Sequence, residues 1–239
     1  MAKTIAIFGA GGTMGLAIAT RFGKAGYNVG LVARRKENLE TLKAQLAEAG
    51  VTAVKTVTGD VTDADQIKSA AKEIRGAFGS IDVVEYSPAL GPQNYRGALD
   101  TTYANALAAF NLIVGGAVKV VNEVSGEMIE RGDGGLLFIA GGSAIKPIPP
   151  LANIGIATSG LRNYLSNLHG ALKQKGVYVG AIFVSGLIKR GTEVDPDEIA
   201  EKLFAMYEAR GNGEDTVTGP MPPPPPGGPG GPGGPPPKP

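Results

Sequence analysis

Short apolar runs alternate with longer amphipathic segments along most of this chain. The runs are continuous in Val, Ile, Leu and Ala, which is typical of parallel strands that are covered on both faces. Regular alternation of strand and helix predicts an α/β fold: one doubly wound, Rossmann-type parallel sheet with helices on both faces. The predicted strands lie near residues 3–8, 27–33, 52–57, 81–86, 135–140 and 177–184, and the predicted helices near residues 13–25, 36–49, 63–78, 99–131, 154–175 and 195–210.

A glycine-rich turn joins the first predicted strand to the first predicted helix. A turn that opens a helix presents free N–H groups and the positive end of the helix dipole, and both favour a pyrophosphate. Glycine also lets phosphates approach without a Cβ clash. The simpler interpretation is a tight turn that only connects two elements. The turn runs Gly-Ala-Gly-Gly-Thr-Met-Gly, and its predicted cofactor-binding residues are Gly9, Gly11, Gly12, Thr13, Met14 and Gly15.

Two basic residues, Arg34 and Arg35, follow the second predicted strand. In a β-α-β dinucleotide site, this position faces the ribose that carries the adenine. A carboxylate there binds the ribose diol, whereas a basic side chain neutralises a 2′-phosphate. The two arginines therefore favour NADP(H) over NAD(H) as the cofactor.

Residues 220–239 depart from the alternating pattern. They are almost entirely Pro and Gly and lack the apolar side chains that offset the entropy of ordering. We therefore predict one globular domain over residues 1–219, followed by a disordered or partly polyproline II tail. The run Pro222 to Pro226 could bind a proline-recognition module, but a solvated tail is the simpler interpretation.

Composition narrows the possible functions. A net charge of +1 without a basic block argues against a nucleic-acid partner. The absence of cysteine excludes thiol chemistry, and a single histidine, His169, makes a histidine-based metal site improbable. The chain begins in a strand and shows neither a signal peptide nor a long apolar run, so we expect a cytoplasmic protein without a membrane partner.

With these motifs in place, the chain resembles the short-chain dehydrogenase/reductase superfamily over residues 3 to 200. The opening turn of that family reads Gly-x-x-x-Gly-x-Gly, and here Thr13 replaces the middle glycine. The pair Asp60-Val61 matches the residues that contact adenine, and Ser87 falls where the fourth strand meets the cofactor ribose. The resemblance implies an NADP(H)-dependent oxidoreductase acting on a small carbonyl or alcohol. It also implies a homo-oligomer, built through the helices at 99–131 and 154–175.

The catalytic positions of the family are only partly kept. Ser143 falls where the family serine polarises the substrate carbonyl, but Ile154 and Thr158 occupy the positions of the catalytic Tyr and Lys. Isoleucine has no proton to transfer, and threonine supplies no cation. Ile113 similarly replaces the family's helical Asn, and Asn111 lies on roughly the opposite helix face. The chain resembles a divergent bacterial branch that also lacks the Tyr-Lys pair.

Other residues are candidates for the missing proton donor. Tyr86, at the end of the fourth predicted strand, is the best placed, so Ser143 and Tyr86 are the predicted catalytic residues. Glu85 beside it is unusual at a strand end, because burial there would raise the pKa of its carboxyl. Lys146 and His169 are weaker candidates. If no donor serves, the alternatives are an NADP(H)-binding sensor or regulatory protein, or a scaffold that acts through its tail.

Overall fold

A computed structural model describes residues 2–220, so all of the predicted Pro/Gly tail except Pro220 lies outside the described residues. The described chain forms a single parallel sheet in the strand order β3-β2-β1-β4-β5-β6-β7. This confirms the predicted fold class. The strands are β1 (Thr4–Phe8), β2 (Asn28–Ala33), β3 (Val54–Thr58), β4 (Val83–Tyr86), β5 (Gly134–Gly141), β6 (Val177–Ser185) and β7 (Glu214–Thr218).

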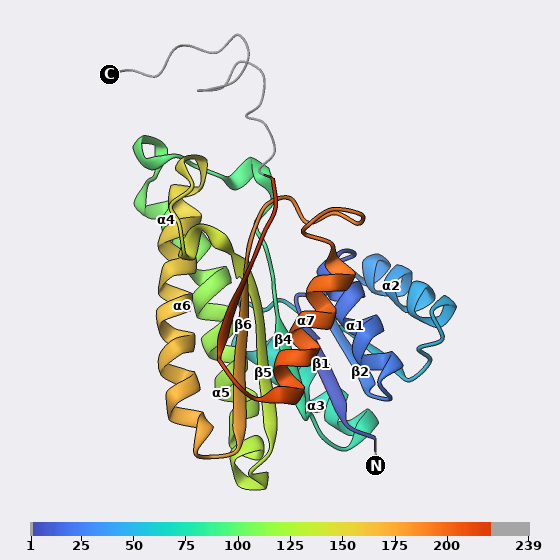
Figure 1. Ribbon diagram of the computed structural model, residues 1–239. Coiled ribbons are helices and arrows are strands. Elements are labelled where there is room, and N and C mark those ends of the chain that lie inside the picture. Colours follow the sequence, from blue (N-terminus) through green and yellow to red (C-terminus); the bar gives the residue numbers. More distant parts are fainter. Residues whose placement is uncertain (1, 221–239) are drawn as a thin grey trace.

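Helices cover both faces of the sheet (Figure 1). One face carries α3, α5 and α6, and the other carries α1, α2 and α7. The helices are α1 (Met14–Lys24), α2 (Lys36–Glu48), α3 (Ala64–Phe78), α4 (Tyr103–Phe110), α5 (Gly116–Arg131), α6 (Ala152–Lys173) and α7 (Pro196–Ala209). Short helical turns lie at η1 (Pro92–Asn94), η2 (Ala98–Asp100), η3 (Asn111–Gly115), η4 (Gly142–Ala144) and η5 (Pro149–Leu151).

Two details differ from the predicted elements. The strand β7 was not predicted, because its sequence Glu-Asp-Thr-Val-Thr is polar and its side chains are exposed or only half-buried. It is an edge strand that pairs with β6 alone. The helix predicted over residues 99–131 begins only at Tyr103 and is divided into α4, a π-helical turn η3 and α5.

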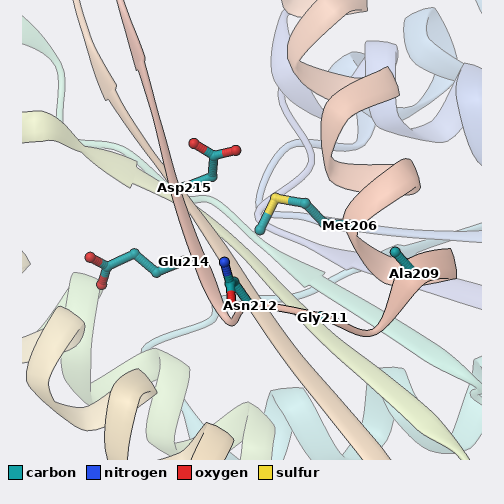
Figure 2. Close-up of a pocket in the computed structure, with 6 residues that line it drawn as sticks. All are labelled: Met206, Ala209, Gly211, Asn212, Glu214 and Asp215. Carbon is teal, nitrogen blue, oxygen red and sulfur yellow. The ribbon is translucent and has the colours of Figure 1, made fainter.

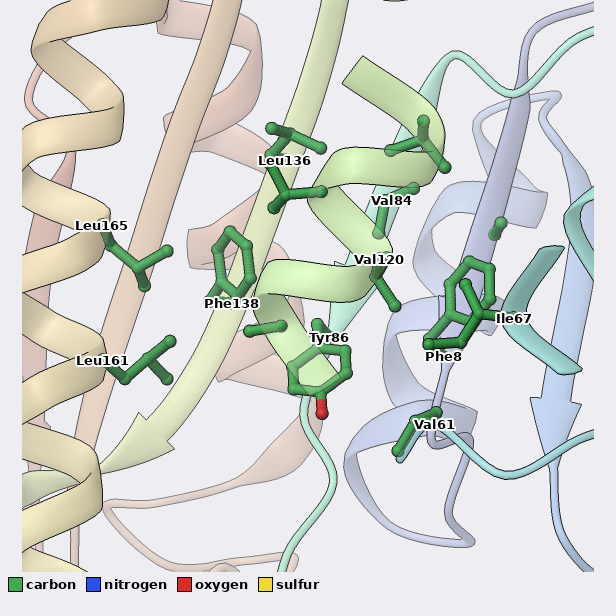
Figure 3. Close-up of a cluster of buried hydrophobic side chains, with 14 of the residues drawn as sticks. Phe8, Val61, Ile67, Val84, Tyr86, Val120, Leu136, Phe138, Leu161 and Leu165 are labelled. Carbon is green, nitrogen blue, oxygen red and sulfur yellow. The ribbon is translucent and has the colours of Figure 1, made fainter. Parts of the chain in front are cut away.

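The core consists of one apolar cluster on each face of the sheet. Figure 3 shows the cluster beneath α3, α5 and α6. In it the side chains of Phe8, Tyr86 and Phe138 are at most 1% exposed. This packing also explains the composition of the segment Tyr103–Arg131, which by length and apolar content alone could cross a membrane. Its apolar face lies in this cluster, and Val120 and Val124 are among the buried residues.

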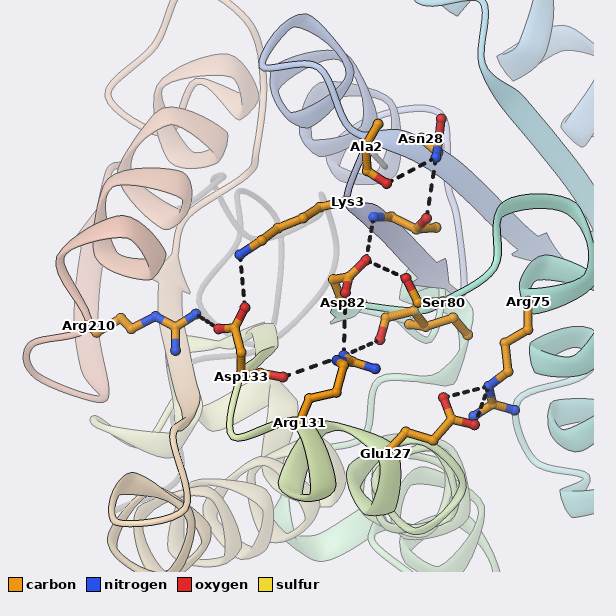
Figure 4. A network of polar contacts seen from close by, with 12 residues as sticks. Ala2, Lys3, Asn28, Arg75, Ser80, Asp82, Glu127, Arg131, Asp133 and Arg210 are labelled. Atoms are coloured by element: carbon orange, nitrogen blue, oxygen red, sulfur yellow. Dashed lines mark hydrogen bonds and ion pairs between the residues drawn. The ribbon is translucent and has the colours of Figure 1, made fainter.

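Polar side chains concentrate instead at the amino ends of the strands (Figure 4). Asp82 accepts hydrogen bonds from the Thr4 N–H at 2.8 Å and from the Ser80 hydroxyl at 2.9 Å, and it pairs with Arg131 at 3.4 Å. Nearby, Asp133 pairs with Lys3 and Arg210. These contacts connect β1 to β4 and stabilise the amino ends of the strands. The glycine-rich turn lies at the opposite, carboxyl ends.

We predict that Asp82→Ala lowers the free energy of unfolding by about 3 kcal/mol, because it leaves the buried Thr4 N–H and the Arg131 guanidinium without their acceptor. Lys3→Ala is the contrasting variant, since Lys3 and Asp133 form an exposed pair and should cost less than about 1 kcal/mol. Urea unfolding followed by circular dichroism measures both. Equal losses in the two variants would contradict a structural role for Asp82.

Candidate active site

The carboxyl ends of the central strands border one cavity of about 620 Å³. It begins at the glycine-rich turn after β1 and extends to the ends of β5 and β6. Parallel strands place all their carboxyl ends at one edge, and β1 lies where the strand order reverses, which is where open α/β sheets bind ligands. The cavity contains most of the predicted site residues: Gly9, Gly11, Gly12, Thr13, Met14, Gly15, Arg34, Arg35, Tyr86, Ser87 and Ser143.

The glycine-rich turn has the geometry of an anion site. The Leu16 N–H bonds to the Gly11 carbonyl at 3.0 Å, and within the described residues the N–H groups between them have no backbone acceptor. Thr13 precedes α1, yet its hydroxyl does not cap the helix and stays available to a ligand. Gly9 adopts a φ of +89°, and a Cβ there would meet Pro88 at 2.9 Å. These features fit the pyrophosphate of a dinucleotide.

Arg34 and Arg35 stand exposed at the end of β2, and both border the same cavity. They are the only charged side chains among its described lining residues. A cationic wall beside the N-terminus of α1 fits a phosphate on the adenosine ribose. The glycine-rich turn and the arginines together can therefore hold NADP(H).

The residues that the sequence placed against adenine lie outside this cavity. Asp60 accepts from both the N–H and the hydroxyl of Thr62 at 2.8 Å, so its carboxylate stabilises the turn after β3. Val61 is buried against the core on the α5 side. Neither residue borders the cavity, and their contact with adenine stays a prediction.

Ser143 lies at the opposite end of the cavity, in the turn η4 that follows β5. Its Oγ is 3.0 Å from the Oγ1 of Thr158 on α6, and both side chains are buried. Thr158 can direct its single hydroxyl hydrogen to the Ile154 carbonyl, 3.1 Å away, or to Ser143. In the second arrangement the Ser143 hydrogen is free to point into the cavity. The pair is therefore an uncharged donor that needs only two hydroxyl rotations.

Tyr86 borders the cavity, but the predicted role of proton donor does not fit its position. Its hydroxyl donates to the Leu112 carbonyl in the π-helical turn η3, and burial strongly raises the pKa of the phenol. A Cβ on Gly116 would collide with this hydroxyl, so Tyr86 fills the space at the start of α5. Figure 3 shows the ring packed within the core beside Phe138. This arrangement fits a structural role in the core, and the role of Tyr86 as proton donor stays a prediction.

Glu85, its neighbour on β4, is completely buried on the opposite face of the sheet. Neither carboxyl oxygen has a partner in hydrogen-bonding geometry. Burial raises the pKa of Glu85 from 4.5 to about 8, and the nearby Ser87 hydroxyl opposes part of this rise. The carboxyl is therefore mostly neutral at pH 7.

The sequence did not predict that residues 90–95 form one wall of the cavity. Tyr95 borders the cavity from the loop between η1 and η2. The buried Asn153 holds this loop on both sides of Tyr95, because its amide accepts from the Arg96 N–H and donates to the Asn94 carbonyl, each at 3.0 Å. No local sequence pattern marks such a contact, since Asn153 lies on α6, more than fifty residues away.

Most of the remaining lining at this end of the cavity is aliphatic. The side chains come from the loop after β4, from η3 and α6, and from the segments around η5 and after β6. No charged side chain is among them within the described residues, and the hydroxyls of Ser143, Thr158 and Tyr95 are the nearby polar groups. The aliphatic residues are Leu90, Ile113, Ile148, Leu151, Ile154, Leu161, Leu187 and Ile188.

A second hollow, of about 330 Å³, lies between α7 and β7 (Figure 2). Its two carboxylates already have partners, since Glu214 pairs with Arg162 and Asp215 with Lys202. Figure 2 shows these two side chains on opposite sides of the strand. Because no polar groups converge there, this hollow is not a candidate active site.

Comparison with known proteins agrees with this geometry. The family model for short chain dehydrogenases matches residues 3–198. The chain belongs to the short-chain dehydrogenase family. One relative is the 3-oxoacyl-[acyl-carrier-protein] reductase FabG of Staphylococcus aureus (strain N315), which is 23% identical over 217 residues that cover 90% of this chain and 87% of that protein. Nodulation protein G of Azospirillum brasilense is 28% identical over 182 residues, or 75% of this chain and 72% of that protein.

Solved structures of other short-chain dehydrogenases have the same fold. An NADPH-bound short chain oxidoreductase from Pseudomonas aeruginosa PAO1, described as containing an atypical catalytic center, superposes with a TM-score of 0.81 at 19% identity. The matched region covers 91% of this chain and 95% of that one. The L-sorbose reductase of Gluconobacter frateurii, complexed with NADPH and L-sorbose, gives a TM-score of 0.79 at 20% identity, with 91% and 95% covered. These findings confirm the predicted family and Rossmann-type fold.

In this short-chain dehydrogenase, the positions expected to carry the proton relay face the cavity but are apolar or uncharged. Ile154, Thr158 and Ile113 all line it. Asn111 is exposed at the start of η3, as its offset of two residues predicted. Lys146 is exposed and does not border the cavity, and His169 is bonded through Nδ1 to the Val179 carbonyl at 2.8 Å. Neither restores the missing cation or acid.

The raised pKa of Glu85 predicts a stability effect. Its folded-state value is about 8 and its ordinary value is 4.5, so stability is lost as the pH rises through this window. The free energy of unfolding should fall by on the order of 5 kcal/mol across it. Glu85→Gln lacks this titration and should be as stable as the wild type near about pH 5 and clearly more stable at about pH 9. Urea unfolding at both pH values tests this; parallel changes in the two proteins would exclude the assignment.

Proposed function

We propose that this chain is an NADP(H)-dependent oxidoreductase that acts on a small, apolar carbonyl compound or the corresponding alcohol. The observation that carries the proposal is one continuous cavity with an anion site and two arginines at one end and the Ser143–Thr158 hydroxyl pair at the other. The aliphatic lining around Ser143 favours an uncharged, apolar substrate, because a charged group would lose hydration there without a partner.

The residues around Ser143 suggest how the protein contributes to the reaction. The bound nicotinamide supplies or accepts the hydride. Ser143 donates a hydrogen bond to the substrate oxygen once Thr158 turns its own hydrogen from the Ile154 carbonyl to the Ser143 Oγ. A donor aimed at the developing negative charge, in a cavity with few competing polar groups, stabilises the transition state more than the ground state.

A second candidate is an NADP(H)-binding sensor without turnover. It is favoured by Ile154 and Ile113, which face the cavity at the relay positions and cannot move a proton. Both candidates predict the same cofactor, and only the first predicts consumption of NADPH.

A homo-oligomer forms part of the proposal. The apolar side chains of Tyr103, Leu107 and Phe110 form one stripe along α4 and are exposed to 82%, 38% and 44%. A row of this kind, at i, i+4 and i+7 spacing, is typical of a helix that packs against another surface.

We predict that Arg34→Ala and Arg35→Ala weaken NADPH binding, by about 10-fold for each charge-assisted contact that is lost. Binding of NADH should change little, because it lacks the 2′-phosphate. Isothermal titration with both nucleotides measures the effect. Lys36→Ala is the matched control, since Lys36 is the next exposed cation and does not border the cavity. Equal affinity of the wild type for NADPH and NADH would refute the cofactor assignment.

Ser143→Ala should lower kcat by about 100-fold while leaving NADPH affinity unchanged, because it removes a donor that acts in the transition state. Thr158→Val should have a smaller effect in the same direction. Ser159→Ala, which removes the neighbouring exposed hydroxyl on α6, serves as the control. NADPH consumption is measured over a panel of neutral ketones and aldehydes. Clear NADPH binding with no consumption over the whole panel would favour the sensor.

A further inference from the structure

Glu85 is the one carboxyl group of the described core for which the fold supplies no partner. It is completely buried, and both of its carboxyl oxygens lack a hydrogen-bond partner. The other buried carboxylate, Asp82, lies at the amino end of the same strand and is bound by Thr4, Ser80 and Arg131. An apolar residue at position 85 would avoid the desolvation cost. The fold itself therefore gives no reason for an acid here.

The strand register places Glu85 directly beneath the cavity. Glu85 is level with Ile7 on β1 and Leu137 on β5, and all three face the cluster under α1 and α7. Residues two positions apart on a strand share a face and are separated by about 6.6 Å. Two positions beyond these three residues lie Gly9, Ser87 and Ile139, and all of them line the cavity. Glu85 therefore forms the layer immediately under the cavity floor.

Ser87 provides the connection between this layer and the cavity. Ser87 follows Glu85 by two positions, which places it on the same side of the sheet, and the residue borders the cavity. A neutral carboxyl has one O–H donor, and a serine hydroxyl can accept one hydrogen bond while donating another. A hydrogen bond from Glu85 to Ser87 would leave the serine hydrogen pointing into the cavity.

We propose that Glu85, acting through Ser87, is the proton source of this active site in place of the missing tyrosine. The inference rests on the proposed function. In reduction, hydride forms the new C–H bond, the C=O π pair moves to oxygen, and that oxygen takes the proton of Ser87. Ser87 takes the proton of Glu85 in turn, and Glu85 becomes a carboxylate that water reprotonates before the next turnover. In oxidation of the alcohol, the same carboxylate accepts the proton.

The other titratable groups on this side of the sheet cannot replace Glu85 as the proton source. They lie either farther from the cavity along the strands or at the protein surface. On the same face, Tyr178 and Tyr207 lie over Gly135, one layer nearer the amino ends of the strands. The cavity itself adds Arg34, Arg35, Tyr86 and Tyr95. The charged side chains of the covering elements are exposed or half-buried; they are Arg21, Lys24, Lys189, Arg190, Glu193, Asp195, Asp197, Glu198, Glu201, Lys202 and Glu208.

The proposal predicts the sign of the pH dependence. Because the neutral acid donates, reduction should slow as the pH rises through the pKa of Glu85, and oxidation should accelerate over the same range. Glu85→Gln cannot release a proton, so its kcat for reduction should fall by about 100-fold with little change in KM. The decline of kcat with rising pH should be absent in this variant. Ser87→Ala should lower kcat similarly. Glu201→Gln removes an exposed carboxylate of α7 and should retain the wild-type profile.

The test combines this pH profile with infrared difference spectroscopy of the full chain, recorded with and without NADPH. We expect the C=O band of a neutral carboxylic acid in the wild type and in Ser87→Ala, and its absence in Glu85→Gln. NADPH should shift the band in the wild type and shift it less in Ser87→Ala. This readout does not depend on turnover and is unaffected if a variant is merely less stable.

The outcomes separate the two proposals. Carbonyl reduction with an unchanged pH profile in Glu85→Gln would overturn the role of Glu85 and leave the proposed function intact. A band absent at pH 7, or unaffected by NADPH, would also overturn it. A third outcome is that no carbonyl is reduced but the band still responds to NADPH through Ser87. This outcome would overturn the proposed reductase activity and support Glu85 as an acid that senses bound cofactor.

Discussion

The parallel pairing of β1 with both β2 and β4 is the constraint on which the rest of this structure depends. The strands β2 and β3 lie on one side of β1, and β4 to β7 lie on the other. The connections therefore diverge at the carboxyl end of β1 and leave a crevice there. The glycine-rich turn fills that crevice with unbonded N–H groups, and the ends of β2, β4, β5 and β6 surround it. The ionic contacts at the amino ends, centred on Asp82 and Asp133, stabilise the opposite edge.

Within this frame, the cavity has two electrostatically different ends. Arg34 and Arg35 make the cofactor end cationic, whereas the end around Ser143 has hydroxyls and aliphatic side chains but no charge among the described lining residues. In the short-chain dehydrogenase family, a lysine supplies a cation at the position that the resemblance assigns to Thr158. The Ser143–Thr158 pair is uncharged, and the buried carboxyl of Glu85 lies one layer deeper.

Tyr86 and Glu85 show how strand alternation decides the role of two adjacent residues. Tyr86 faces α5, and its hydroxyl stabilises the π-helical turn that divides the long helical segment. Glu85 faces the other side, where no polar group satisfies it. A phenol held by a carbonyl is unavailable for proton transfer, whereas an unsatisfied carboxyl near a serine is well suited to it.

The sequence by itself determined the sheet, its first six strands, the glycine-rich turn and the arginine pair. These depend on local apolar runs and on residues close together in the chain. It also predicted, from the i, i+4 spacing, that Ile154 and Thr158 stand at the positions of the family's Tyr and Lys. Only the tertiary structure decided the burial and contacts of Tyr86, Glu85 and Asn153, and it alone revealed β7. Strand β7 is held by one neighbour rather than by apolar residues of its own, and the clamp from Asn153 to the Tyr95 loop joins distant segments. Such contacts depend on which faces meet after folding, and no local pattern encodes them.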